Sequence, residues 1–138
     1  MMTLNANKQK MFYALYGAEV PIYDYYTDEE GNQIPIDTGE VQIVFNEPVQ
    51  FSNGISGKLS EALIETFGVN DSSMYAQMNY LANEYPFEVG TLIWKKSEIK
   101  YKDEEKTIPD PISADYTVAG ILDEFPNVWS CLLKRVVK

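Results

Sequence analysis

"SADYTVAGILDEFPNVWSCLLKRVVK" (residues 113–138) decides the fold class of this 138-residue chain. Apolar and polar residues alternate on both sides of a turn signal at Pro126 and Asn127. Alternation with a period of two is typical of strands that bury one face. The stretch therefore predicts a hairpin that completes a sheet, with strands at 115–122 and 128–137.

Four further runs upstream are rich in β-branched and aromatic residues, which favour strands. We therefore predict a mainly β fold: a small β-barrel with long loops and room for one short helix, in a single domain spanning residues 1–138. The remaining strands are expected at 10–27, 40–51, 74–82 and 90–102. The first of these is interpreted as a hairpin that reverses at 17–19.

One segment carries a helical period instead. In "GKLSEALIETFG" (57–68), apolar residues recur at every fourth position from Leu59 to Phe67. Ser60 is suited to cap such a helix and Gly68 to terminate it. The periodicity predicts one short amphipathic helix here.

The predicted core and the predicted turns complete the fold expectation. Polar turns are expected at 28–32 and 37–39, and Pro48 indicates an edge, a bulge or a bend. The segments 52–73 and 103–113 are expected to be mobile loops in the free protein. We expect four large residues in the core: Trp94, Tyr116, Trp129 and Leu133.

Composition excludes several function classes. Eleven basic against twenty-one acidic residues give a formal net charge of −10, which disfavours a protein that reads nucleic acid in a groove. Histidine is absent, so the commonest general base and metal ligand are missing. Cys131 is the single cysteine and lies in an apolar run, which predicts a buried residue with no disulfide. We expect no enzyme, no cofactor and no metal site, in a soluble intracellular protein without a membrane segment.

Two stretches imitate ligand-binding loops. "YTDEEGNQIPID" (26–37) resembles a calcium loop, but a tyrosine occupies the first ligand position, so a solvated turn is favoured. "SNGISGK" (52–58) contains glycines, but leucine follows its lysine where a phosphate-binding loop needs serine or threonine. Neither stretch predicts a site.

Several pieces of the chain, in this order, resemble one family. They are "NANKQKMFYALYGAEVPIYD", "EPVQFSNGIS", "ETFG", "GTLIWKKSE" and "ADYTVAGILDEFPNVWSCLLKRV". Together they look like the small head-closure (head–tail connector) proteins of long-tailed bacteriophages that infect Gram-positive bacteria. Two departures stand out: "SGKLSEA" lacks a glycine common in relatives, and relatives suggest an extended segment where we predict the helix.

The resemblance implies a structural role without catalysis. A ring of subunits, hexameric or dodecameric in the virion, would lie below the portal and adaptor rings, retain packaged DNA and provide the attachment platform for the tail. Its partners would be the portal and adaptor proteins, the tail terminator protein and further copies of itself, with DNA passing through the lumen. Its location would be the virion neck, and the host cytoplasm during assembly. The alternative is a tail-completion (tail-terminator-like) protein or another non-enzymatic β-barrel module that binds proteins.

The residues expected to form assembly contacts lie in the two loops, because binding residues concentrate on loops held by a rigid scaffold. The candidates are Asn53, Gly54, Ser56, Lys58, Asp103, Glu104, Glu105 and Asp110.

Overall fold

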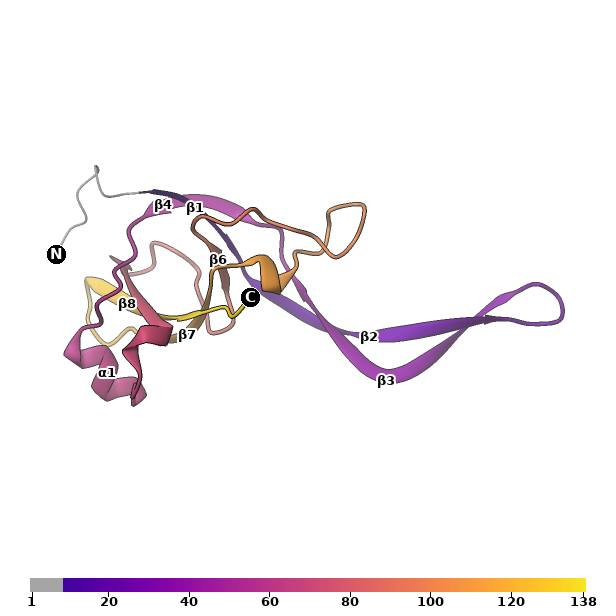
Figure 1. The fold of residues 1–138 in the computed structure, drawn as a ribbon, viewed down its shortest axis with the longest axis horizontal. Helices are drawn as coiled ribbons and strands as arrows, with labels where there is room; N and C mark the ends of the chain where they lie inside the picture. The colour runs from indigo at the N-terminus through magenta and orange to yellow at the C-terminus, as the bar shows by residue number, and fades with distance from the viewer. Residues whose placement is uncertain (1–8) are drawn as a thin grey trace.

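The computed structural model describes residues 9–138, which form a curled six-stranded sheet and a long two-stranded hairpin that projects from it (Figure 1). The fold is mainly β, as predicted. The elements of the described chain are β1 Gln9–Ala14, β2 Tyr16–Thr27, β3 Gln33–Phe45, β4 Val49–Asn53, α1 Glu61–Phe67, β5 Tyr75–Leu81, β6 Leu92–Trp94, β7 Tyr116–Leu122 and β8 Val128–Arg135, with short 3-10 turns at Ser72–Met74 and Pro111–Ser113.

The six-stranded sheet is antiparallel throughout, in the order β4-β1-β6-β7-β8-β5, and curls into a barrel-like shape. Its edge strands are β4 and β5. Just beyond β4, Ser56 exchanges two backbone hydrogen bonds with Gln77 of β5, at N–O distances of 2.8 and 2.9 Å. The side-chain amide of Asn53 also donates to the carbonyl of Asn79 at 3.1 Å. These bonds join the two edges, so the predicted barrel-like fold is confirmed.

The C-terminal hairpin is confirmed as β7 and β8. Strand β8 lies between β7 and β5, so it is an interior strand of the sheet. The pairing of β7 with β8 shifts between Val118 and Gly120, which marks a bulge or irregularity.

The core confirms three of the four expected residues. Trp94, Tyr116 and Leu133 are buried, and the indole of Trp94 donates to the Ser113 hydroxyl at 3.0 Å. The expectation for Trp129 is wrong, because this side chain is only partly buried at the margin of the core. Its indole N–H bonds the carbonyl of Phe125 in the β7–β8 turn, which keeps the ring at the end of the barrel.

The predicted helix is confirmed as α1. The Ser60 hydroxyl caps it by accepting from the amide of Leu63, and Gly68 ends it with a left-handed φ of 63°. Leu63 is fully buried, and Phe67 lies over Gly120 of β7. An ideal Cβ on Gly120 would lie 2.5 Å from Cε1 of Phe67, so glycine is what lets the helix approach the sheet.

The strands around the projecting hairpin differ from the prediction. The reversal expected at 17–19 is wrong, because β2 runs through these residues and pairs with β3. The chain reverses instead at the predicted turn 28–32, where the Asp28 carboxylate accepts from the amides of Glu30 and Asn32.

Two neighbouring predictions are corrected on β3. The turn expected at 37–39 is wrong: it lies inside β3, where the register shifts and Gly39 adopts a φ of 79°. The single strand expected at 40–51 is divided into two, the end of β3 and β4. Around Pro48 the chain passes from the two-stranded hairpin to the six-stranded sheet.

The strand expected at 90–102 is wrong over most of its length. Only β6 pairs in the sheet, because the amides of the three residues after Trp94 turn to the carboxylate of Asp115. The loops 52–73 and 103–113 contain local order. The first includes α1, and the second includes a turn in which the Asp103 carboxylate accepts hydrogen bonds from the amides of Thr107 and Ile108. Their mobility stays a prediction.

We expect Gly120→Ala to destabilise the protein by about 1–3 kcal/mol, because the added methyl group overpacks the contact with Phe67. Urea unfolding followed by circular dichroism would measure the loss. In a Phe67→Ala background the same substitution should cost much less, since the clashing ring is gone. Gly57→Ala is the matched control, because its Cβ would meet nothing closer than 4.0 Å. An equal cost at both glycines would contradict this packing.

Candidate assembly surface

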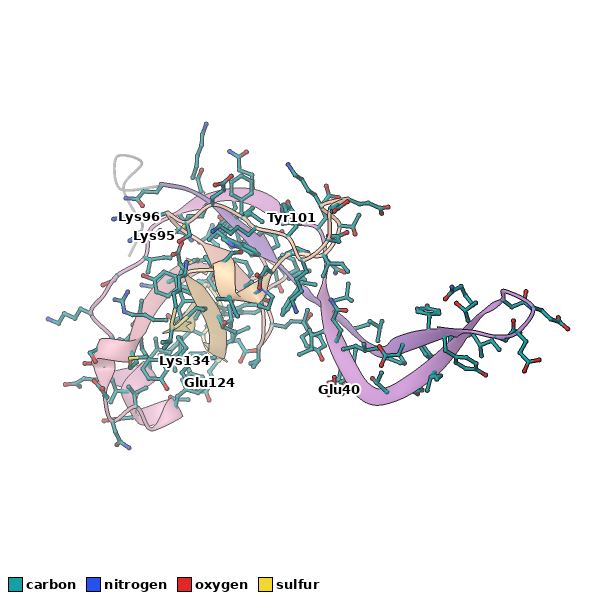
Figure 2. All side chains as sticks on the ribbon, turned by 45° about the vertical axis from the view of Figure 1, so that its right-hand side comes forward. Glu40, Lys95, Lys96, Tyr101, Glu124 and Lys134 are labelled. Carbon is teal, nitrogen blue, oxygen red and sulfur yellow. The ribbon has the colours of Figure 1, made fainter. Side chains whose placement is uncertain are left out.

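The hairpin of β2 and β3 projects well beyond the barrel (Figures 1 and 2). Its strands are 12 and 13 residues long. At roughly 3.3 Å per residue, β2 alone spans about 40 Å. Only its base packs on the barrel, where Phe45 is buried and its ring meets that of Tyr16 edge to face at 5.9 Å.

The projecting part of the hairpin leaves large apolar side chains uncovered. A two-stranded ribbon alone in water is marginally stable, and clustered exposed apolar side chains mark a surface that another molecule covers. The seven exposed members are Val20, Tyr23, Tyr25, Tyr26, Ile36, Val41 and Ile43.

A groove of about 690 Å³ lies where the hairpin leaves the barrel. Ile22 and Val41 contribute its hairpin wall, and Leu92 and Thr117 its barrel wall. The groove extends the apolar surface of the hairpin toward the barrel.

The hairpin is also strongly acidic. Residues 16–45 contain seven acidic residues and no lysine or arginine. Three of the acids, Asp28, Glu29 and Glu30, are consecutive at the tip. The hairpin therefore presents carboxylates and apolar side chains together.

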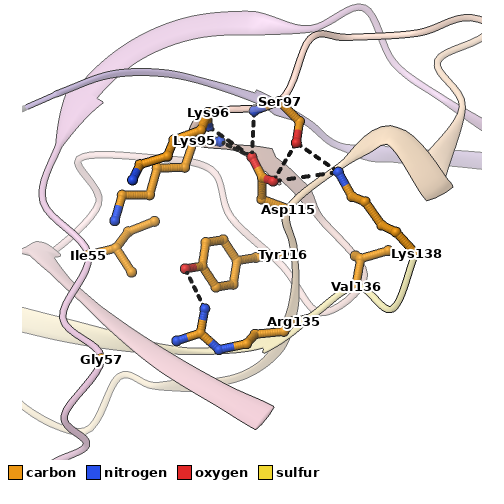
Figure 3. A pocket seen from close by; sticks show the side chains of 10 residues that line it. All are labelled: Ile55, Gly57, Lys95, Lys96, Ser97, Asp115, Tyr116, Arg135, Val136 and Lys138. Atoms are coloured by element: carbon orange, nitrogen blue, oxygen red, sulfur yellow. Dashed lines mark hydrogen bonds and ion pairs between the residues drawn. The ribbon is translucent and has the colours of Figure 1, made fainter. Parts of the chain in front are cut away.

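A second surface feature has the opposite charge. A hollow of about 470 Å³ lies between the segment after β4, the segment after β6, the start of β7 and the end of β8 (Figure 3). Four cationic side chains and one carboxylate line it, and we call it the basic hollow. The residues that define it are Ile55, Gly57, Lys95, Lys96, Ser97, Asp115, Tyr116, Arg135, Val136 and Lys138.

Asp115 organises one wall of the basic hollow. One carboxylate oxygen accepts from the backbone amides of residues 95–97 at 2.8 to 3.0 Å, and the other accepts from the Ser97 hydroxyl at 2.6 Å. Lys138 lies 3.5 Å from the same carboxylate. Partial burial raises the pKa of Asp115, but the bonds from the Ser97 hydroxyl and the three amides outweigh it and hold the pKa well below the ordinary value of 3.8. The carboxylate is therefore ionised and fully engaged in holding its wall.

Arg135 forms the floor of the basic hollow with Tyr116. Its guanidinium carbon lies 5.5 Å from the centre of the Tyr116 ring, and Nη1 donates to the tyrosine hydroxyl at 3.1 Å. Nε donates to the carbonyl of Ser73. These neutral partners fix the guanidinium and leave its charge without a carboxylate.

The structure separates the predicted contact residues into two groups. Asn53, Gly54 and Ser56 lie at the seam that closes the sheet, and Lys58 is exposed just beyond it. The remaining candidates, Asp103, Glu104, Glu105 and Asp110, lie on a loop at the other end of the barrel (Figure 1). In that loop Glu104 and Glu105 are exposed, whereas Asp103 and Asp110 accept backbone amides and cap local turns.

Sequence reasoning missed both the projecting hairpin and the basic hollow. A signal for the hairpin exists: two β-prone runs, 16–27 and 33–45, flank the turn Asp-Glu-Glu-Gly-Asn, and no base occurs between Lys10 and Lys58. The basic hollow has no comparable signal, because its lining residues come from four segments that are separated in the chain.

Other chemistry in the described chain is limited. Burial raises the pKa of the Cys131 thiol to about 12, against a smaller lowering by its hydrogen bond to Tyr80, so the predicted buried cysteine is confirmed. Residues 9–138 contain no group of three side chains suited to hold a metal ion. Over the same residues, no helix has the length and apolar character needed to cross a membrane.

No protein-family model, curated protein or solved structure matches the chain. Its fold and its two charged surfaces are therefore the observations that bear on its function.

We expect Asp115→Asn to lower the free energy of unfolding at pH 7 by about 1.5–3 kcal/mol, because bonds to a charged acceptor are replaced by bonds to a neutral one. A carboxyl whose folded pKa is lowered stabilises the fold above its unfolded pKa, and the contribution is lost as the pH falls toward the folded value. The difference between wild type and variant should therefore shrink below pH 4.

Urea unfolding at pH 7 and pH 3 would measure the difference in the free energy of unfolding between wild type and Asp115→Asn. Asp123→Asn is the control, because this exposed carboxylate accepts no hydrogen bond among the described residues. A difference that stays constant between the two pH values would contradict the role of the Asp115 charge.

Proposed function

We propose that this protein is a structural assembly component: a head-closure protein that forms a ring between the portal–adaptor assembly and the tail of a long-tailed bacteriophage. The single observation that carries an assembly role is the projecting hairpin. Its seven exposed large apolar side chains are covered by nothing within the described chain. A partner that covers them would supply the burial that a two-stranded ribbon lacks.

The specific assignment to the head-closure family rests on the sequence resemblance. The quoted pieces "EPVQFSNGIS" and "ADYTVAGILDEFPNVWSCLLKRV" correspond to the closing seam and to the β7–β8 hairpin of the barrel. A barrel-like sheet is the fold that the resemblance implies. In this proposal the protein acts in the virion neck and reaches it from the host cytoplasm.

The charge of the chain is compatible with a ring through which DNA leaves. A net charge of −10 reduces attraction to phosphates, and attraction at many positions would slow DNA exit. No step of this role needs a nucleophile, a general base or a metal ion.

We expect disruption of the gene, in the phage that encodes this chain, to yield separate tails and heads that have lost their DNA. Wild-type protein supplied in trans should restore joined particles. Tyr25→Thr with Ile36→Thr should fold normally but fail to restore them, because these exposed residues belong to the uncovered hairpin surface and threonine keeps the β-propensity. Negative-stain electron microscopy would count the particles.

Val89→Thr with Ile112→Thr is the matched control, since both residues are 64% exposed and lie off the hairpin. This control should restore particles as well as wild type. Joined, DNA-filled particles in the disrupted phage would contradict the proposal. Heads that keep their DNA beside tails of abnormal length would point to the tail-completion alternative instead.

A further inference from the structure

We propose that the basic hollow binds the acidic tip of the β2–β3 hairpin of a second copy of this chain. This contact rests on the proposed assembly role and specifies how neighbouring copies meet. Four observations carry it: the uncompensated cations of the hollow, the free carboxylates of the tip, the position of the hollow and the apolar match between the two surfaces.

Three of the four cations of the basic hollow, Lys95, Lys96 and Arg135, lack an acidic partner within the described chain. Within residues 9–138 the single ion pair joins Lys138 to Asp115. Lys95 and Lys96 make no side-chain hydrogen bond in this part of the chain, and their ammonium groups extend over the hollow toward Ile55 (Figure 3). In a protein with twenty-one acidic residues, three cations that have no carboxylate partner and share one hollow favour an acidic ligand from outside.

The hairpin tip supplies free carboxylates. The Asp28 carboxylate is engaged within the turn itself. It accepts hydrogen bonds from the backbone amides of Glu30 and Asn32 and from the side-chain amide of Asn32. Glu29 and Glu30 are exposed, and their side chains accept no hydrogen bond within the described chain. They stand at the end of a narrow two-stranded element, which can enter a hollow that a flat face could not.

The basic hollow cannot be filled by the hairpin of its own chain. Figure 2 shows Lys95 and Lys96 on the side of the barrel away from the hairpin, which extends in the opposite direction past Glu40. A contact between the two features therefore requires a second molecule. Every copy carries one tip and one hollow, so the contact repeats from copy to copy.

The two surfaces also match in apolar character. Behind the tip, Tyr25, Tyr26 and Ile36 are exposed on the hairpin. The hollow offers Ile55 and Val136, together with the methylene stems of its lysines. Its volume of about 470 Å³ has room for more than one side chain. DNA phosphate is the competing anionic ligand, but the net charge of −10 opposes its approach.

Charge reversal tests the contact. In sedimentation velocity of the full chain, the average sedimentation coefficient should rise with protein concentration, as copies associate, and fall with added salt. Glu29→Lys with Glu30→Lys, or Lys95→Glu with Lys96→Glu, should each weaken self-association at least tenfold, because like charges then meet. The chain that carries all four substitutions should regain association, since the reversed tip again faces a hollow of opposite charge.

The matched control combines Lys95→Glu and Lys96→Glu with Glu104→Lys and Glu105→Lys, which gives the same net charge but leaves the tip acidic. It should remain as weak as the hollow variant alone. Circular dichroism would verify that each variant is folded.

Three results would overturn the contact. They are a wild-type chain that stays monomeric, a four-substitution chain that stays dissociated, and hollow variants that associate normally yet lose binding to a double-stranded DNA oligonucleotide. None of these results would change the particle phenotype of the disrupted gene, so failure of this contact is distinct from failure of the assembly role.

Discussion

The pair of backbone hydrogen bonds between Ser56 and Gln77 is the constraint on which the rest of the structure depends. It joins the segment beyond β4 to β5, the two edges of the six-stranded sheet. Gln77 is buried, and its side chain extends the same junction: its carbonyl oxygen accepts from the amide of Ser60, and its amide donates to Asn79. One residue of β5 thereby fixes the closure of the sheet and the entry to α1.

Closure of the sheet explains where the surfaces lie. The residues on either side of Ser56, Ile55 and Gly57, are held against the barrel and become a wall of the basic hollow. Because the two sheet edges bond each other at the seam, few unpaired backbone N–H and C=O groups are left there for another strand to pair with. The hairpin of β2 and β3 is different, since its two strands pair only with each other and their faces carry the exposed apolar residues.

The sequence was informative where local rules decide the structure. The β7–β8 hairpin, the capped helix at Ser60 and the turn at 28–32 follow from alternation, periodicity and turn chemistry, and all three are present. Strand limits failed where a distant side chain intervenes. Residues 95–102 have the composition of a strand, but the carboxylate of Asp115 takes the first amides away from the sheet.

The candidate surfaces were predictable only in part. The loop around Ser56 was expected to make contacts between molecules, and it lies beside the basic hollow although its backbone serves the closure of the barrel. The loop at Glu104 and Glu105 was grouped with it, yet the structure places the two at opposite ends of the barrel (Figure 1). Spatial grouping of charge depends on how the sheet curls, and no local pattern in the sequence encodes the curl.

The direction of the hairpin has a consequence for the kind of assembly this chain can build. A tip that points away from its own hollow makes the proposed contact heterologous, so one copy uses its tip while its neighbour uses its hollow. Such a contact leaves one free tip and one free hollow after each copy is added, until the row of copies closes into a ring. A ring removes both free ends at once, and the rotation between neighbours sets the number of copies. In this proposal the acidic hairpin and the basic hollow are two halves of one interface, and ring closure would bury the apolar surface that is exposed on a single copy.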